Sequence, residues 1–230
     1  MRIVISHFVD YEKPLRMLIM SLVAANVTLR DVVVFGTGFS NHSSKFMTVA
    51  PKTHVFMFTQ PESNWEYSSF GMLQRFIDHP RVRSDSYMMI HDTTLAHPGF
   101  PGIDFSSDKL AKYDVVRTRG VTANIFALRH AVVGLLPRVP TMNKSVGIKY
   151  EHKDSIFDHF NQSQILFSSG RICSNKLGFV NILHRWMKQY YIPKKQDVYK
   201  TGKPARVECY YECFHLSKFF SLQHHDLSEK

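Results

Sequence analysis

Cysteine is scarce in this sequence: three cysteines, at positions 173, 209 and 213, stand among 230 residues. So small and odd a number cannot supply the paired bridges of a disulfide-stapled secreted domain, and we expect a protein of a reducing compartment. Cys209, Cys213 and His215 together raise a zinc hypothesis. Structural zinc normally takes four ligands in two close pairs, and the sequence lacks a second pair here, so ordinary packing is the competing interpretation.

Long apolar runs are also lacking. The opening residues 2–6 have neither the apolar stretch nor the small-residue cleavage site of a signal peptide, and no run approaches the roughly 20 residues of a membrane span. We therefore expect a soluble, cytoplasmic protein with no membrane-spanning segment. Internal repeats and low-complexity tracts are absent from the sequence as well. With 44% hydrophobic residues the chain can build a core, and its length fits one compact α/β domain.

Acidic residues are outnumbered, and the formal net charge is +10 with a sequence pI near 9.5. A positive field concentrates anions, so the partner is expected to be a nucleotide, a nucleic acid or a phosphorylated membrane rather than a cation. A solvated basic surface that serves solubility is the competing interpretation. Aromatic and cationic residues interleave between Tyr190 and Lys200, which keeps a nucleic-acid-binding module open as the non-enzymatic alternative.

Short β-branched runs alternate with amphipathic segments over the first hundred residues. Residues 3–5, 31–35, 53–58 and 87–90 are typical of buried strands. Helical spacing appears after Pro14 and again through Phe70, Leu73 and Ile77, with a capping-box spacing at 63–66 and a stop at Pro80. The alternation predicts a mostly parallel sheet with helices on both faces.

The second half of the sequence has a looser pattern. Residues 113–117 and 124–128 predict two strands joined by a turn at Gly120, and such a pair can be antiparallel. Apolar spacing over 180–190 predicts a helix that ends at Pro193. We expect a main domain over 1–192, with a nucleotide-binding half at 1–100 and an acceptor half at 101–192, followed by a basic, aromatic appendage over 193–230.

Ligands in open α/β sheets bind beyond the carboxyl ends of the strands. That rule selects residues 6–10, 36–38 and 91–94. Asp92 follows a buried apolar strand, where an unpaired carboxylate would cost several kcal/mol and normally has a cation or a hydrogen-bond donor as partner. Magnesium or manganese bound there would complete its coordination with diphosphate oxygens and water. The alternative is that Asp92 caps the next turn through neighbouring N–H groups.

Three blocks, residues 3–15, 64–76 and 90–94, resemble the amino-terminal glycosyltransferase domain encoded by chloroviruses, large viruses of chlorella-like algae. The resemblance covers roughly the first two thirds of the chain and fades after about Tyr150. It implies a GT-A fold, a single Rossmann-like domain that binds a UDP-sugar and a divalent metal, Mn²⁺ or Mg²⁺, through an Asp-x-Asp motif. It also implies a glycan acceptor on viral capsid glycoprotein, in the cytoplasm of an infected host cell.

This sequence departs from the motif at its second acid, because Asp92 is followed by Thr93 and Thr94. Asp92 is then the one carboxylate expected both to bind the metal and to take part in catalysis. By resemblance, residues 7–10 hold the uracil and ribose, and the helix with Tyr67, Gln74 and Arg75 lines the donor cleft. The full set of expected nucleotide-sugar ligands is Ser6, His7, Phe8, Val9, Asp10, Gly36, Thr37, Tyr67, Gln74, Arg75, His91, Asp92 and Thr93.

Physical reasoning supports two members of this set. Phe8 offers a flat apolar face for a base, and Arg75 can pair with a phosphate through two hydrogen bonds. A core position for Phe8 and a solvated Arg75 are the alternatives.

The acceptor side carries a weaker signal. An inverting transferase requires a base near the acceptor hydroxyl, whereas a retaining one can dispense with it. The candidates for such a base are His152, Asp154, Asp158 and His159. Asp158 is our choice among them, with an ordinary surface position as the alternative. His184 lies near the apolar face of its predicted helix, which favours a core histidine over a metal ligand.

Two rival enzyme classes fit less well. Phosphohydrolases of the His-Asp type place that pair on a helix, whereas His91 and Asp92 follow a strand-like run. Sugar nucleotidyltransferases use a Gly-rich phosphate loop after the first strand, and residues 6–8 contain no glycine. The sequence therefore favours a glycosyltransferase that moves a hexose, or a deoxyhexose such as rhamnose, from a UDP-sugar to a glycan; we expect no stable nucleic-acid partner.

Overall fold

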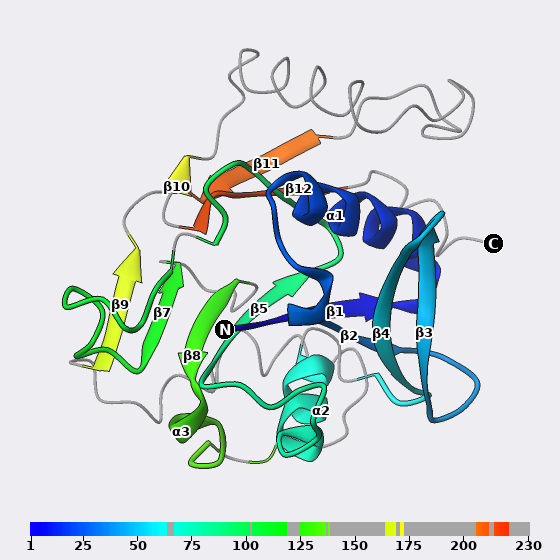
Figure 1. Ribbon diagram of the computed structural model, residues 1–230, viewed down its shortest axis with the longest axis horizontal. Coiled ribbons are helices and arrows are strands. Elements are labelled where there is room, and N and C mark those ends of the chain that lie inside the picture. Colours follow the sequence, from blue (N-terminus) through cyan, green and yellow to red (C-terminus); the bar gives the residue numbers. More distant parts are fainter. Residues whose placement is uncertain are drawn as a thin grey trace.

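A computed structural model describes residues 1–63, 67–101, 103–118, 125–136, 138, 164–168, 171–172, 206–211 and 214–220. Its centre is an eight-stranded sheet with the strand order β3-β4-β2-β1-β5-β8-β7-β9 (Figure 1). The strands are β1 Arg2–Phe8, β2 Val32–Thr37, β3 Ser43–Ala50, β4 Thr53–Gln60, β5 Ser86–His91, β7 Val115–Thr118, β8 Phe126–Arg129 and β9 Ile165–Ser168.

Parallel pairing dominates the middle of this sheet. β1 pairs in parallel with β2 and β5, β2 pairs in parallel with β4, and β7 pairs in parallel with β9. Antiparallel pairs join β3 to β4 and place β8 between β5 and β7. The predicted α/β class, with a mostly parallel sheet and a small antiparallel part, is confirmed. The two strands predicted over 113–117 and 124–128 are β7 and β8, and they pair antiparallel.

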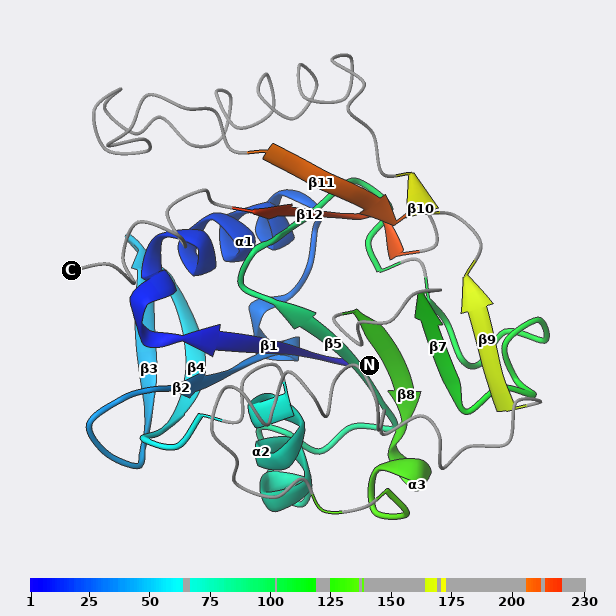
Figure 2. The ribbon, with the colours of Figure 1, turned by 180° about the vertical axis from the view of Figure 1, so that it is seen from behind.

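Helices cover both faces of the sheet (Figure 2). They are α1 Glu12–Ala24, α2 Ser68–Phe76 and the short α3 His130–Val133, with single 3-10 turns at η1 Val9–Tyr11 and η2 Leu29–Asp31. Alternate residues of each buried strand face α1 on one side and α2 on the other, so two apolar cores form. Within the described residues, no helix is both long and apolar enough to cross a membrane.

The core facing α1 contains Leu15, Leu18, Ile19 and Leu22 of that helix, none of which has any exposed surface. These residues stand at the i, i+3, i+4 and i+7 positions of the predicted apolar face, whereas Val23, predicted at i+8 of the same face, is 39% exposed. The core facing α2 contains Phe70 and Leu73 of that helix. The expected helix entry at 64–66 and the expected helix over 180–190 lie outside the described residues.

A second, four-stranded sheet lies on the α1 side, in the order β10-β11-β12-β6 (Figure 1). Its strands are β6 Thr94–Ala96, β10 Arg171–Ile172, β11 Arg206–Tyr211 and β12 Leu216–Phe220, and all its pairs are antiparallel. β6 is held against α1 by a hydrogen bond from the Ala96 backbone N–H to Ser21 Oγ, at 2.9 Å. Residues near the carboxyl terminus therefore pair directly with the segment that follows Asp92.

Residues 206–220 belong to the expected appendage, whose boundary at 192/193 lies outside the described part of the chain. Phe214 and Leu216 have no exposed surface and join the core that faces α1. The chain is thus packed into the main core at these two residues.

The strand β3 was not predicted from the sequence. It pairs antiparallel with β4 at the edge of the large sheet, and half of its residues are exposed. Val49, at 6% exposed, is its one buried hydrophobic residue, so β3 contains no buried apolar run. An edge strand with one covered side lacks the continuous apolar pattern by which the central parallel strands were found.

Leu216→Ala is expected to lower the free energy of unfolding by about 2–5 kcal/mol, because it removes a fully buried side chain from a closely packed core. Leu135→Ala is the matched control, since Leu135 is 79% exposed and its loss should change stability by less than about 0.5 kcal/mol. Urea unfolding measures both. Equally small changes in the free energy of unfolding for both variants would contradict the packing of Leu216 into the core.

His97, which follows β6, and His215, which precedes β12, extend the contact between these two strands. The backbone N–H of His97 donates to the carbonyl of His215 at 2.9 Å. Burial, and secondarily the neighbouring His215, lower the pKa of His97 to about 4. The unfolded chain therefore binds this proton at a higher pH than the folded chain does.

Stability contributed by neutral His97 should be complete above about pH 6.5 and should be lost as the pH falls from 6.5 towards 4. His97→Asn should flatten this part of the stability profile, because asparagine does not titrate there. Urea unfolding at pH 7, 5.5 and 4.5 tests it, and parallel profiles for both proteins would contradict the assignment.

Candidate functional site

Three loops selected from the sequence meet at the carboxyl ends of β1, β2 and β5. The register pairs Ser6 with His91 on one side of β1, and His7 with Gly36 on the other side. The backbone N–H of Asp92 donates to the carbonyl of Ser6 at 3.0 Å, which continues the β1–β5 ladder past the end of β5. The strand ends therefore bring residues 6–10, 36–38 and 91–94 together at one edge of the sheet.

The carboxylate of Asp92 is buried at this edge, with 5% of the residue exposed. Its Oδ2 lies 3.0 Å from His7 Nδ1 and 3.1 Å from the backbone nitrogen of Phe8. A carboxylate can only accept, so the Nδ1 of His7 carries a hydrogen and donates it. Both bonds run to the end of β1.

The segment from Gly36 to Gly38 lets two aromatic rings lie against the strand ends. Gly38 has a φ of 79°, and a Cβ at this residue would stand 2.8 Å from the ring of Phe8. Phe8 also makes an edge contact with Tyr11, with ring centroids 6.0 Å apart. Phe8 is half-buried, and Asp10, two residues further along the chain, is exposed.

Thr94 occupies the place of the second acid in the expected motif. It has no exposed surface, and its Oγ1 donates to the carbonyl of His91 at 2.6 Å. The chain enters β6 at this residue, and Thr94 pairs there with the backbone of Lys218. A carboxylate in place of Thr94 would be buried within this junction, which accounts for a neutral residue at the position.

The fit of a divalent metal depends on Asp92. Among the described residues there is no group of three or more His, Cys, Asp or Glu side chains that could hold a metal ion. Asp92 can still supply a carboxylate, and Mg²⁺ is commonly held by one or two carboxylates while substrate phosphates and water complete its octahedron. Asp92 therefore fits a divalent cation whose remaining ligands are substrate phosphates and water.

α2 follows the carboxyl end of β4 in the chain and covers the face of the sheet opposite α1. Tyr67 is 3% exposed, and Gln60, at the end of β4, is 4% exposed. Arg75 Nη1 lies 3.5 Å from Gln60 Oε1, so this exposed arginine reaches back towards the strand ends. Gln74 instead donates from Nε2 to the carbonyl of Leu136 at 3.2 Å, close to α3.

These positions do not decide the roles of Arg75 and Gln74 in donor binding, which stay predictions along with those of Tyr67, Val9 and Thr93. The location of Arg75 agrees with a phosphate-binding role better than that of Gln74 does. α3 follows the carboxyl end of β8, which is antiparallel to β5, so Gln74 points to the opposite edge of the sheet.

Two residues at this edge were not predicted from the sequence to belong to the site. Phe39 follows the Gly-Thr-Gly segment, and its backbone N–H donates to the carbonyl of Gln60 at 3.2 Å. Arg117 stands near the carboxyl end of β7, which runs in the same direction as β5, and it is 8% exposed. A charge near the end of an apolar strand was the signal that selected Asp92, and the same signal applies to Arg117.

Other sequence-based candidates lie outside the described residues. They are Asp158 with the neighbouring His152, Asp154 and His159, the core candidate His184, and the side chains of Cys173, Cys209 and Cys213.

The chain is similar to solved glycosyltransferase structures. One is the galactosyltransferase LgtC in complex with donor and acceptor sugar analogs, at 10% identity and a TM-score of 0.45 over 73% of each chain. Another is the glycosyltransferase GlyE of Streptococcus pneumoniae TIGR4, at 10% identity and a TM-score of 0.42 over 85% of this chain and 53% of GlyE. The chain thus spans about half the length of GlyE.

No protein-family model and no curated protein matches the chain. At 10% identity, the structural similarities leave the function to be inferred from the site residues of the chain itself.

Asp92→Ala should cost about 1–3 kcal/mol of unfolding free energy, because it leaves the donors of His7 and Phe8 facing a buried gap. Asp92→Asn should cost less, since its amide oxygen can still accept from Phe8. The exposed Asp108, replaced by alanine, is the control and should have little effect. Chemical denaturation compares the three variants, and equal stability for Asp92→Ala and the control would contradict the geometry.

Proposed function

We propose that this protein is a GT-A glycosyltransferase that transfers a sugar from a UDP-sugar to a glycan acceptor. The donor diphosphate binds at the carboxyl ends of β1, β2 and β5. The observation that carries the proposal is the buried carboxylate of Asp92, which the end of β1 fixes through His7 and the Phe8 N–H. A carboxylate fixed at the carboxyl edge of a parallel sheet stands where α/β proteins bind nucleotides.

The transfer breaks the bond between the anomeric carbon and the diphosphate oxygen, and forms a bond from that carbon to an acceptor hydroxyl oxygen. UDP leaves with the bonding electrons, and the hydroxyl proton passes to a base, for which Asp158 is our candidate. Asp92 would hold Mn²⁺ or Mg²⁺, which supplies positive charge to the diphosphate as it leaves. Phe8 offers an apolar face to the uracil, and Arg75 can pair with a phosphate.

The identity of the sugar and acceptor is proposed from the resemblance to the chlorovirus domain. It favours a hexose or a deoxyhexose such as rhamnose, transferred to a glycan of viral capsid glycoprotein in the cytoplasm of an infected cell. Residues 1–100 would bind the donor and residues 101–192 the acceptor.

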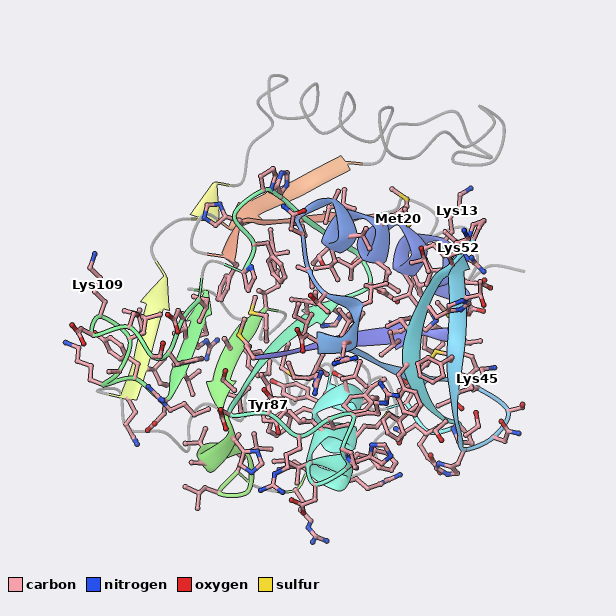
Figure 3. All side chains as sticks on the ribbon, in the orientation of Figure 1. Lys13, Met20, Lys45, Lys52, Tyr87 and Lys109 are labelled. Carbon is pink, nitrogen blue, oxygen red and sulfur yellow. The ribbon has the colours of Figure 1, made fainter. Side chains whose placement is uncertain are left out.

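A nucleic-acid-binding protein is the second candidate, favoured by the net charge of +10. Exposed lysines lie at both outer strands of the large sheet. Lys45 is on β3 at one side of the sheet, and Lys109 lies near β7 and β9 at the other side (Figure 3). Nucleic-acid affinity through such residues falls steeply as salt rises, because bound counterions are released. Binding of a mixed-sequence oligonucleotide at 50 mM and 200 mM salt measures this property.

UDP with Mn²⁺ should raise the melting temperature of the wild-type protein by several degrees, since a ligand at 100 times its Kd adds about 2.7 kcal/mol of stability. Asp92→Asn should abolish the shift, because it removes the negative charge while an oxygen remains for Phe8. Differential scanning fluorimetry with UDP, GDP and no nucleotide, with and without Mn²⁺, measures the shift.

Asp108→Asn is the matched control and should keep the full shift, since it removes an exposed carboxylate elsewhere. An equal shift in Asp92→Asn would remove Asp92 from the donor site. Tight, salt-sensitive oligonucleotide binding without any UDP response would favour the second candidate.

A further inference from the structure

We infer that Phe39 is a positioning residue of the donor site: its ring fixes His7, and through His7 it fixes the carboxylate of Asp92. The inference rests on the proposed function and extends it to a residue with no expected role in donor binding. Phe39 lies in the loop after β2, at the same edge of the sheet as Asp92.

The ring of Phe39 lies directly on the backbone of β2. A Cβ at Gly36 would stand 2.7 Å from Phe39 Cε2, 3.3 Å from Cδ2 and 3.4 Å from Cζ. Real Cβ atoms do not approach ring carbons as closely as the first of these distances, so the ring can occupy this place only because residue 36 is glycine. The backbone N–H of Phe39 bonds to the carbonyl of Gln60, which anchors the loop to the end of β4.

Gly36 is the register partner of His7 on the neighbouring strand. A ring seated over Gly36 therefore lies beside the imidazole of His7, and the two ring centroids are 6.0 Å apart at an angle of 55°. His7 is 3% exposed, and its Nδ1 bonds to Asp92 Oδ2 at 3.0 Å. The contacts thus form one chain, from Gly36 through Phe39 and His7 to Asp92.

Phe39 limits both the motion and the hydration of His7. An aromatic side chain beside the imidazole restricts its rotation and keeps water from the bond to Asp92, where a lower local dielectric strengthens the hydrogen bond. Groups that orient a ligand-binding side chain without touching the ligand commonly change affinity or activity by about 10- to 100-fold when they are lost. The same effect is expected for Phe39.

The test combines Gly36→Ala, Phe39→Ala, Phe39→Leu and double variants with Gly36→Ala. Gly36→Ala and Phe39→Ala should each weaken UDP–Mn²⁺ binding by about tenfold or more in calorimetry. Phe39→Leu should bind within about threefold of wild type, and it should rescue Gly36→Ala, because leucine keeps an apolar cover and has no ring to meet the new Cβ. Gly36→Ala with Phe39→Ala should bind no more weakly than Phe39→Ala alone.

Gly134→Ala is the matched control. A Cβ at Gly134 has no atom within 4 Å, so this variant should keep wild-type affinity. Circular dichroism and the melting temperature of each variant show whether it is folded, and affinities are compared at a temperature where all variants are folded.

The second readout, the Nδ1–H resonance of His7 in ¹H–¹⁵N spectra, is independent of UDP. It should be visible in wild type and Gly134→Ala, and exchange-broadened in Gly36→Ala and Phe39→Ala. An unchanged resonance in Phe39→Ala overturns the inference, and so does a lost resonance with unchanged UDP affinity. If wild type binds no UDP, the proposed function fails, while a resonance that still depends on Phe39 shows that the contact chain itself is correct.

Discussion

The donor-site model depends on one buried carboxylate. Asp92 can remain charged beneath the surface only if donors surround it, and the end of β1 supplies the imidazole of His7 and the N–H of Phe8. Those donors are in place because β1 and β5 are parallel neighbours whose carboxyl ends lie at the same edge of the sheet. The same pairing that builds the core of the sheet therefore fixes the geometry of the site.

The loops that follow β4 and β5 at this edge are contacted from both faces of the large sheet. Thr94 begins β6, which pairs with β12 from the far end of the sequence and packs on α1 through Ser21. On the other face, Arg75 reaches from α2 towards Gln60 at the strand ends. A nucleotide at this edge would meet loops that belong to two sheets, so donor binding and the packing of residues 206–220 are expected to depend on one another.

The sequence predicted the parts of the fold that rest on periodic apolar residues. The four parallel strands contain buried apolar runs and α1 has a periodic buried face, so their apolar patterns mark them in the sequence. The strand β3 has little buried surface, and the pairing of β12 with β6 joins residues more than a hundred positions apart, which no local pattern encodes. Asp92 was found because a charge at the end of an apolar strand is unusual. Phe39 was missed because its role arises from the absent side chain of Gly36 on the strand beneath it.

A crystal structure of the protein with UDP and Mn²⁺ is the most direct test of the donor site. We expect the diphosphate to lie at the carboxyl ends of β1 and β5, with the cation bound to Asp92 and the uracil against Phe8. UDP bound at another edge of the sheet, with Asp92 still enclosed by His7 and Phe8 and far from any phosphate, would contradict it.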